Sequence, residues 1–246
     1  MALSLGVTTV FAQVGPRGGG APGPNLGGAM NKLFGANQAF TATLEVQNSG
    51  DNGEVTIPGK ISFDNGKSRF EMNMTEMRGA QMPPNAMQQM KAMGMDSIVT
   101  IARPDLKVTY LVYPGLNSYA QMAERDPSAS VSPDDLKIET EKIAAETVDG
   151  HDCVKNKVTV TDKEGGKHVS TVWNAADLKG FPVKIVTSEG GNNATLLFKN
   201  ISLTKPAAGS FEPPAGLTKY DDMQTMMQTE MMKKMGGGRG LPPGQQ

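Results

Sequence analysis

Alternating apolar and polar residues, broken by short turn sequences, constrain the fold of this chain more than any other feature. Phe40, Ala42, Leu44 and Val46 lie two residues apart with polar residues between them, which is typical of a strand with one solvated face. Similar segments recur roughly every ten residues, and Gly, Asn and Asp cluster between them. The pattern predicts an antiparallel, mainly β domain rather than an α/β fold.

Eleven segments share this character, so we expect about ten or eleven strands. Turn sequences such as Asn65-Gly66 and Asp149-Gly150 favour tight hairpins between neighbouring strands. A sandwich, a barrel or a strongly curved open sheet would each accommodate so many short antiparallel strands. The predicted strands are residues 40–47, 55–63, 68–74, 98–102, 108–112, 118–122, 138–147, 153–161, 168–174, 182–188 and 194–203.

Two methionine-rich segments break the alternation and are predicted to be helices. One spans residues 85–93 and follows a Pro-Pro pair, and the other spans residues 221–235. Methionine recurs in both at intervals of three to four residues, which places these side chains on one helical face. The methionines that we single out as lid contacts are Met87, Met90, Met93, Met227 and Met231.

Composition and charge limit the partners of the chain. It has 246 residues, of which 38% are hydrophobic and 20% charged, and its formal net charge is −1. The patterned part, residues 39–235, fits one domain. Nucleic-acid binding normally needs a basic excess that this near-neutral chain lacks, so we expect no nucleic-acid partner.

The two ends of the chain differ in composition from the middle. Residues 1–12 carry an apolar run that ends in Val10-Phe11-Ala12, the kind of sequence that a signal peptidase cleaves. Residues 13–38 and 236–246 are rich in Gly and Pro, which predicts a flexible tether and a disordered tail. No other stretch has the length of a membrane span. We therefore expect an exported protein, periplasmic or secreted, without an integral membrane segment in the mature chain.

Residues with catalytic chemistry are few. Cys153 is the only cysteine, and His151 and His168 are the only histidines. No Gly-x-Ser-x-Gly nucleophile motif or phosphate-binding glycine loop occurs between a predicted strand and a helix. We expect neither an enzyme nor a protein with a bound cofactor, and we assign no residue to a resident metal site.

Three segments of the second half resemble the LolA, LolB and RseB superfamily of periplasmic lipoprotein-sorting and lipoprotein-sensing proteins, and more closely its uncharacterised periplasmic relatives. They are residues 147–153 (Thr-Val-Asp-Gly-His-Asp-Cys), 173–184 (Trp-Asn-Ala-Ala-Asp-Leu-Lys-Gly-Phe-Pro-Val-Lys) and 211–217 (Phe-Glu-Pro-Pro-Ala-Gly-Leu). The resemblance implies an open antiparallel half-barrel of about eleven strands around an apolar hollow. The two methionine-rich helices would then cover the concave face of the sheet.

The predicted function is to hold an apolar ligand, either a lipid, an acyl chain or a lipidated protein, in the hollow of the sheet. Methionine suits a lid because its flexible, polarizable side chain repacks against differently shaped partners. The residues predicted to line the hollow are Phe70, Leu111, Trp173 and Leu197. Two alternatives remain open: a methionine-rich protein that binds Cu(I) or Ag(I) through thioethers, and a structural or interaction module of the cell envelope.

Overall fold

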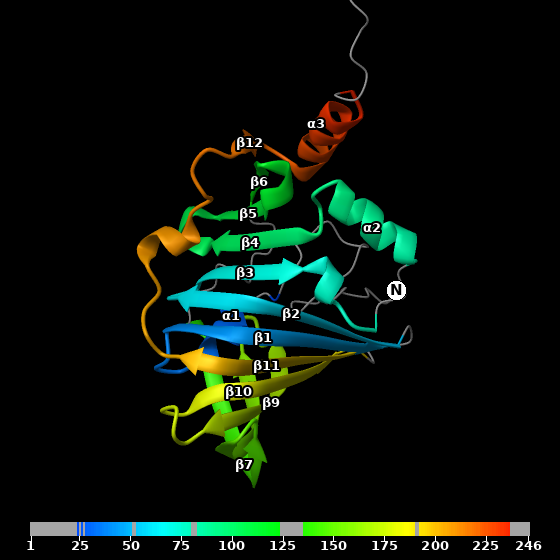
Figure 1. Ribbon diagram of the computed structural model, residues 1–246. Helices are drawn as coiled ribbons and strands as arrows, with labels where there is room; N and C mark the ends of the chain where they lie inside the picture. Colours follow the sequence, from blue (N-terminus) through cyan, green and yellow to red (C-terminus); the bar gives the residue numbers. More distant parts are fainter. Residues whose placement is uncertain are drawn as a thin grey trace, which may run out of the picture.

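The computed structural model describes residues 24, 26, 28–50, 53–79, 83–123, 135–189 and 192–236 (Figure 1). The predicted signal segment, residues 1–12, lies outside this part, as does most of the predicted tail. No helix in the described ranges is long and apolar enough to cross a membrane.

Strands dominate the described part of the chain. They are β1 (Ala39–Gly50), β2 (Gly53–Asp64), β3 (Lys67–Asn73), β4 (Ser97–Arg103), β5 (Val108–Tyr113), β6 (Ser118–Ala123), β7 (Lys137–Val148), β8 (His151–Thr161), β9 (Lys167–Ala175), β10 (Phe181–Glu189), β11 (Asn192–Ser202) and β12 (Thr218–Tyr220). The α-helices are α1 (Gly28–Lys32), α2 (Pro84–Ala92) and α3 (Met223–Gly236), and short 3₁₀ turns include η1 (Met74–Glu76) and η6 (Ala208–Phe211).

All twelve of these strands belong to one sheet, in the order β12-β6-β5-β4-β3-β2-β1-β11-β10-β9-β8-β7. The sheet is open, because its two ends, β12 and β7, do not pair with each other. The eleven predicted strands are confirmed as β1 to β11, and their pairing is antiparallel throughout. The three-residue strand β12 was not predicted, and it pairs with β6 in parallel. A fully antiparallel sheet was therefore a wrong expectation at this edge.

Two hairpins show how local sequence fixes the meander. Asn65 and Gly66 connect β2 to β3 with φ values of 49° and 85°, and Asp149 and Gly150 connect β7 to β8 with values of 49° and 84°. Two consecutive residues with positive φ form the turn whose twist matches that of the paired strands. Asn and Asp tolerate this conformation and Gly adopts it freely, so the strands are joined tightly.

Strand register places the main core on the concave face of the sheet. Residues opposite each other in antiparallel strands point to the same face, so one row can be followed from β1 across to β6. Its members are Ala42, Ile61, Phe70, Thr100, Leu111 and Ala120. On β1 the buried Phe40, Leu44 and Val46 lie on the same face as Ala42. The concave face is thus apolar across much of its width.

The opposite face, which we call the outer face, carries a second and smaller core. Val99, Ile101, Tyr110 and Val112 are buried there under Phe211. Phe211 belongs to residues 203–217, which run outside the sheet from β11 to β12 and which we name the outer strap (Figure 1).

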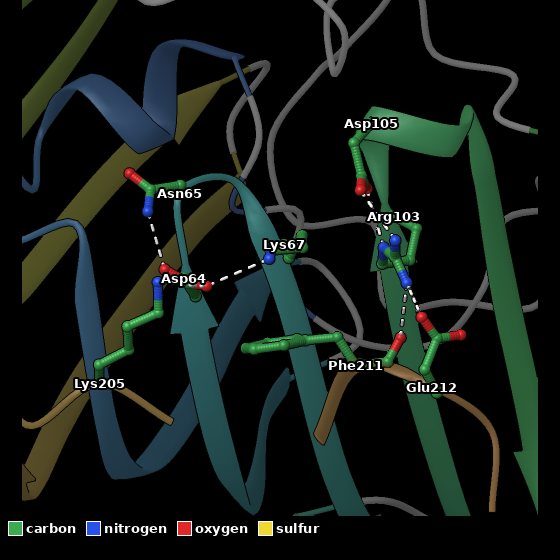
Figure 2. Close-up of polar contacts among 8 residues, drawn as sticks. All are labelled: Asp64, Asn65, Lys67, Arg103, Asp105, Lys205, Phe211 and Glu212. Atoms are coloured by element: carbon green, nitrogen blue, oxygen red, sulfur yellow. Dashed lines mark hydrogen bonds and ion pairs between the residues drawn. The ribbon is translucent and has the colours of Figure 1, made fainter. Parts of the chain in front are cut away.

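Arg103 fixes the outer strap to the sheet. Its guanidinium group donates hydrogen bonds to both carboxylate oxygens of Asp105 at 2.8 Å, to the carboxylate of Glu212, and to the backbone oxygen of Phe211 at 3.4 Å (Figure 2). The ammonium group of Lys67 lies 5.3 Å from the centre of the Phe211 ring. Charge-assisted hydrogen bonds of this kind are stronger than neutral ones, so the strap is firmly held.

Helix α1 corrects the predicted tether, residues 13–38. Leu26, Ala29, Met30, Leu33 and Phe34 are all buried in the main core. The end of this segment therefore packs inside the curved sheet and is not a flexible linker. Helix α3 contacts β6 and β12, so it lies along one edge of the sheet, where its Met226 is buried in the main core, and α1 packs inside the curved sheet (Figure 1).

Candidate functional site

Two of the predicted lining residues lie on the concave face. Phe70 of β3 and Leu111 of β5 belong to the row that crosses the sheet from β1 to β6, and both are buried. The polar Thr100 of β4 lies between them in that row. These two side chains are therefore part of the apolar surface that a ligand in the hollow would contact.

By strand register Trp173 and Leu197 lie on the outer face, and Trp173 is buried and packs with the main core. Trp173 is opposite Lys155 and Lys184, and Leu197 is opposite Lys184 and Glu45. Their neighbours on the strands, Val172 and Leu196, are buried on the concave face instead. Both members of each pair are apolar, so alternation alone does not predict which one points inward.

The outer-face position of Trp173 gives it polar neighbours. The ammonium groups of Lys155 and Lys184 lie 4.8 Å and 4.6 Å from the ring centre. The indole Nε1 donates a hydrogen bond of 2.9 Å to Oε2 of Glu146. These contacts stabilise a tryptophan on the solvent side of the sheet by cation–π attraction and hydrogen bonding.

Half-buried methionines border the concave core where η1, the loop before β4, β6 and α3 approach it. We call them the methionine rim, and they are Met74, Met77, Met95, Met122 and Met227. Met226, next to the last of them, is fully buried. The rim combines methionines from four segments that are distant in sequence, and only the fold brings them to one core.

The other predicted lid methionines are placed differently. Met87 and Met90 of α2 and Met93 directly after it are half-buried, but they are not among the described side chains that pack against the concave core. Met231 of α3 is 38% exposed. Of the five predicted lid contacts, Met227 is thus the one that belongs to the methionine rim.

A buried carboxylate attaches α3 to the sheet edge. Oε1 of Glu230 accepts hydrogen bonds from Ser118 Oγ of β6 at 3.0 Å, Tyr220 Oη of β12 at 2.6 Å and Lys233 Nζ at 2.8 Å. Burial by itself would raise the pKa of Glu230, but these three donors outweigh it and lower the pKa. The contact therefore depends on an ionised carboxylate.

Lys234 connects the end of α3 to the loop after α2. Its Nζ donates a hydrogen bond of 2.6 Å to the backbone oxygen of Met93. The two methionine-rich helices are thus linked through one lysine, with the methionine rim beside α3.

Phenylalanine rings fill the concave side at the ends of β1 and β10. The ring centre of Phe34, just after α1, lies 4.9 Å from Phe40, 5.1 Å from Phe63 and 5.8 Å from both Phe181 and Phe198. The four partners come from β1, β2, β10 and β11. Phe34 and the buried residues before it were not predicted, because they stand in a Gly-rich segment without a long periodic pattern.

Cys153 and His151 both lie in β8 but have different surroundings. Cys153 is buried, and burial raises the pKa of its thiol, which keeps it protonated and a weak nucleophile. His151 Nδ1 lies 2.7 Å from Oδ2 of the exposed Asp177. Among the described residues, no group of three or more His, Cys, Asp or Glu side chains is placed to hold a metal ion. What the site can do chemically is bury apolar surface.

No protein-family model and no curated protein matches this chain. Among solved structures, a LolA superfamily protein from Nitrosomonas europaea is similar over 76% of this chain and 98% of its own, with 10% identity and a TM-score of 0.37. Lipoprotein LppX from Mycobacterium tuberculosis is similar over 76% and 93%, with 11% identity and a TM-score of 0.40. LprF from Mycobacterium bovis is similar over 72% and 92%, with 12% identity and a TM-score of 0.39.

At these identities and TM-scores the likeness does not carry function to this chain.

Proposed function

We propose that this protein is a non-enzymatic binding protein that holds an apolar ligand, such as a fatty acyl chain or the acyl group of a lipidated protein, against the concave face of its sheet. The observation that carries the proposal is the methionine rim, which borders a mainly aliphatic and aromatic core. A rigid core has no need of flexible side chains from four separate segments at its border. A surface that must admit and release apolar chains does.

Burial of methylene groups supplies the binding energy in this proposal. Each buried CH₂ contributes about 0.8 kcal/mol, so covering about eight methylenes would contribute about 6 kcal/mol. This is enough for reversible binding and leaves release possible. The ligand would enter at the rim, since thioether side chains change rotamer more readily than the β-branched residues on the strands.

A fluorescent fatty acid tests the proposal on the full chain. cis-Parinaric acid is expected to bind the unaltered protein with increased fluorescence. Replacing Met74, Met77, Met95 and Met227 together by Gln is expected to weaken binding about tenfold or more, which corresponds to 1.4 kcal/mol, because the rim becomes polar. The matched control replaces the same four residues by Leu, which keeps the apolar volume and should retain binding. Circular dichroism and urea unfolding establish that both variants are folded.

The same pair of variants separates apolar binding from thioether ligation. If the Leu variant lost binding as fully as the Gln variant, sulfur rather than apolar volume would be the requirement, and the acyl-chain proposal would be wrong. A Cu(I) titration of the two variants against a chromogenic chelator then measures the metal alternative directly.

We also propose that the protein works outside the cytoplasm, in the periplasm or after secretion. The support is the apolar segment that ends at Ala12. Fractionation of cells that express the full chain with a C-terminal tag tests this, together with the N-terminal sequence of the product. An uncleaved product that stays in the cytoplasm would contradict it.

A further inference from the structure

The segment before β1 occupies the place where the proposed ligand would lie. Leu26, Ala29, Met30, Leu33 and Phe34 are buried against the concave face, and they belong to the same core cluster as Phe70 and Leu111. The rings around Phe34 come from strands on both sides of the sheet's centre. Helix α1 also contacts β8, five places from β2 in the strand order, so the sheet curls around this segment.

We infer that residues 26–34 are an internal plug, which occupies the concave face as an apolar ligand would and is displaced when the ligand binds. The inference rests on the proposed function and specifies its regulation. The plug, defined here as residues 26–34 without the undescribed position 27, would keep the empty protein closed and would set the affinity for ligand by competition.

The local structure of the plug favours its release. Helix α1 has five residues, and helices of this length do not persist without tertiary contacts. Gly28 at the start of α1 and Gly35 directly after Phe34 have φ values of 53° and 55°, a left-handed conformation that glycine adopts freely. Such positions change backbone direction at little conformational cost. The plug can therefore leave the hollow without unfolding β1.

Asn31 shows that the fit of the plug is imperfect. Its side chain is only 7% exposed, and its Oδ1 is, among the described residues, a buried side-chain oxygen without a hydrogen-bond partner. A buried acceptor that has lost water and gained no donor destabilises the docked state. Release of the plug returns this oxygen to water.

Two substitutions in the plug are expected to change ligand affinity in opposite directions. Phe34→Ala removes the largest docked side chain, so cis-parinaric acid should bind the variant about tenfold or more tightly than the unaltered protein. Asn31→Leu replaces the amide whose oxygen lacks a partner by an apolar group of similar size. The docked plug should then be more stable, and the probe should bind several-fold more weakly. If both variants bound the probe with the affinity of the unaltered protein, the plug would not compete with ligand.

Phe211→Ala is the matched control. Phe211 is as deeply buried as Phe34, but it lies on the outer face, away from the plug. Its truncation should leave probe affinity within about twofold of the unaltered protein, although it also creates a cavity. An equal gain of affinity in Phe211→Ala and Phe34→Ala would mean that any cavity binds the probe, and the inference would fail.

Hydrogen–deuterium exchange tests the inference without any substitution, and so decides it even if Phe34→Ala does not fold. The amides of Leu33, Phe34 and Gly35 donate to the backbone oxygens of Met30, Asn31 and Lys32 at 3.1, 3.1 and 3.3 Å. Saturating oleate should speed exchange of these amides, while amides in β1 and β11 keep their protection. Unchanged or slower exchange in the plug would overturn the inference.

The outcomes also separate this inference from the proposed function. If neither the unaltered protein nor a folded Phe34→Ala variant binds the probe or oleate, both the binding function and the plug are wrong. If the unaltered protein binds and the plug stays in place, only the plug is wrong.

Discussion

A crossing segment packs a phenylalanine against each face of the sheet, Phe34 on the concave face and Phe211 on the outer face, and the two segments are held in different ways. Phe34 lies on the concave face among four other phenylalanine rings, in a segment with an unpaired buried oxygen on Asn31. Phe211 lies on the outer face beside the Lys67 ammonium group, and Arg103 binds the strap through Asp105, Glu212 and a backbone oxygen (Figure 2). Apolar contacts are non-directional and exchangeable, whereas charge-assisted hydrogen bonds fix one geometry. The concave face is therefore suited to exchange its occupant, and the outer face is suited to keep it.

The largest expected effect on stability comes from truncating Phe40, whose ring belongs to the sheet itself. Phe40 is fully buried in β1 and stacks on Phe63 with ring centres 5.2 Å apart, so Phe40→Ala should lower the free energy of unfolding by about 3–5 kcal/mol. Phe34→Ala should cost less, because the plug can shift and the sheet can keep its shape. Urea unfolding of the two variants measures the difference. Equal losses would show that the plug is as rigidly fixed as β1.

Removing the contacts of Arg103 with the outer strap is expected to have a smaller effect on stability. Arg103→Met deletes hydrogen bonds to two carboxylates and a backbone oxygen, and should lower the free energy of unfolding by about 1–3 kcal/mol. Cleavage by thermolysin within residues 203–217 should become faster. Arg78→Met is the control, since Arg78 is paired with Glu45 at 3.2 Å but is 62% exposed, and its loss should cost no more than about 1 kcal/mol. If Arg103→Met cost no more than Arg78→Met, the contrast between the faces would not hold.

Glu230 makes the attachment of α3 dependent on pH. Hydrogen bonds from Lys233, Tyr220 and Ser118 outweigh burial and lower the pKa of Glu230 below its ordinary value of 4.5. The stabilisation is therefore complete above the unfolded pKa and is lost as pH falls through the lower folded pKa. Glu230→Gln should lower the free energy of unfolding by about 1–3 kcal/mol at neutral pH.

The difference between the Glu230→Gln variant and the unaltered protein should shrink as the pH is lowered from about 6 to about 3. Urea unfolding across this range measures it. Asp64 also has a lowered pKa. Hydrogen bonds from Lys67 and Asn65 and ion pairs with Lys67 and Lys205 outweigh the effect of its burial. It contributes equally to both proteins and cancels in the difference. A difference that does not vary with pH would mean that ionisation of Glu230 does not stabilise the edge.

The smallest expected effect concerns Trp173 on the outer face. Lys184→Met removes one ammonium group from the indole ring and should lower the free energy of unfolding by about 0.5–1 kcal/mol. Because Trp173 is the only tryptophan, its fluorescence emission reports on this place alone, and it should shift in the variant. Saturating oleate should leave the emission of the unaltered protein unchanged, since the ligand lies on the other side of the sheet. A strong response to oleate would place the ligand on the outer face.

The strands and their order along the chain were predictable from local sequence. All eleven alternating segments form strands, and the Asn65-Gly66 and Asp149-Gly150 turns join neighbours as expected. Residues 85–93 and 221–235 overlap α2 and α3 almost completely. These elements are long or strongly patterned, and the period of the pattern reports the backbone conformation directly.

The candidate site was only partly predictable. Phe70 stands between the polar Arg69 and Glu71, so its direction toward the core follows from alternation, whereas Leu111 stands between Tyr110 and Val112, which are also buried. Trp173 and Leu197 each follow another apolar residue, and the sequence cannot tell which of the two faces inward. The methionine rim requires knowledge of which loops meet, because its members come from four separate segments.

The sequence by itself determined the mainly β class, the eleven antiparallel strands and the two methionine-rich helices, because alternation, helical spacing and turn residues act within a few residues of one another. Only the tertiary structure decided that residues 26–34 enter the hollow, that β12 pairs in parallel with β6, and that Trp173 lies outside. A five-residue helix and a three-residue strand have little local stability and form through long-range contacts. Those contacts depend on how the sheet curls, which no single segment encodes.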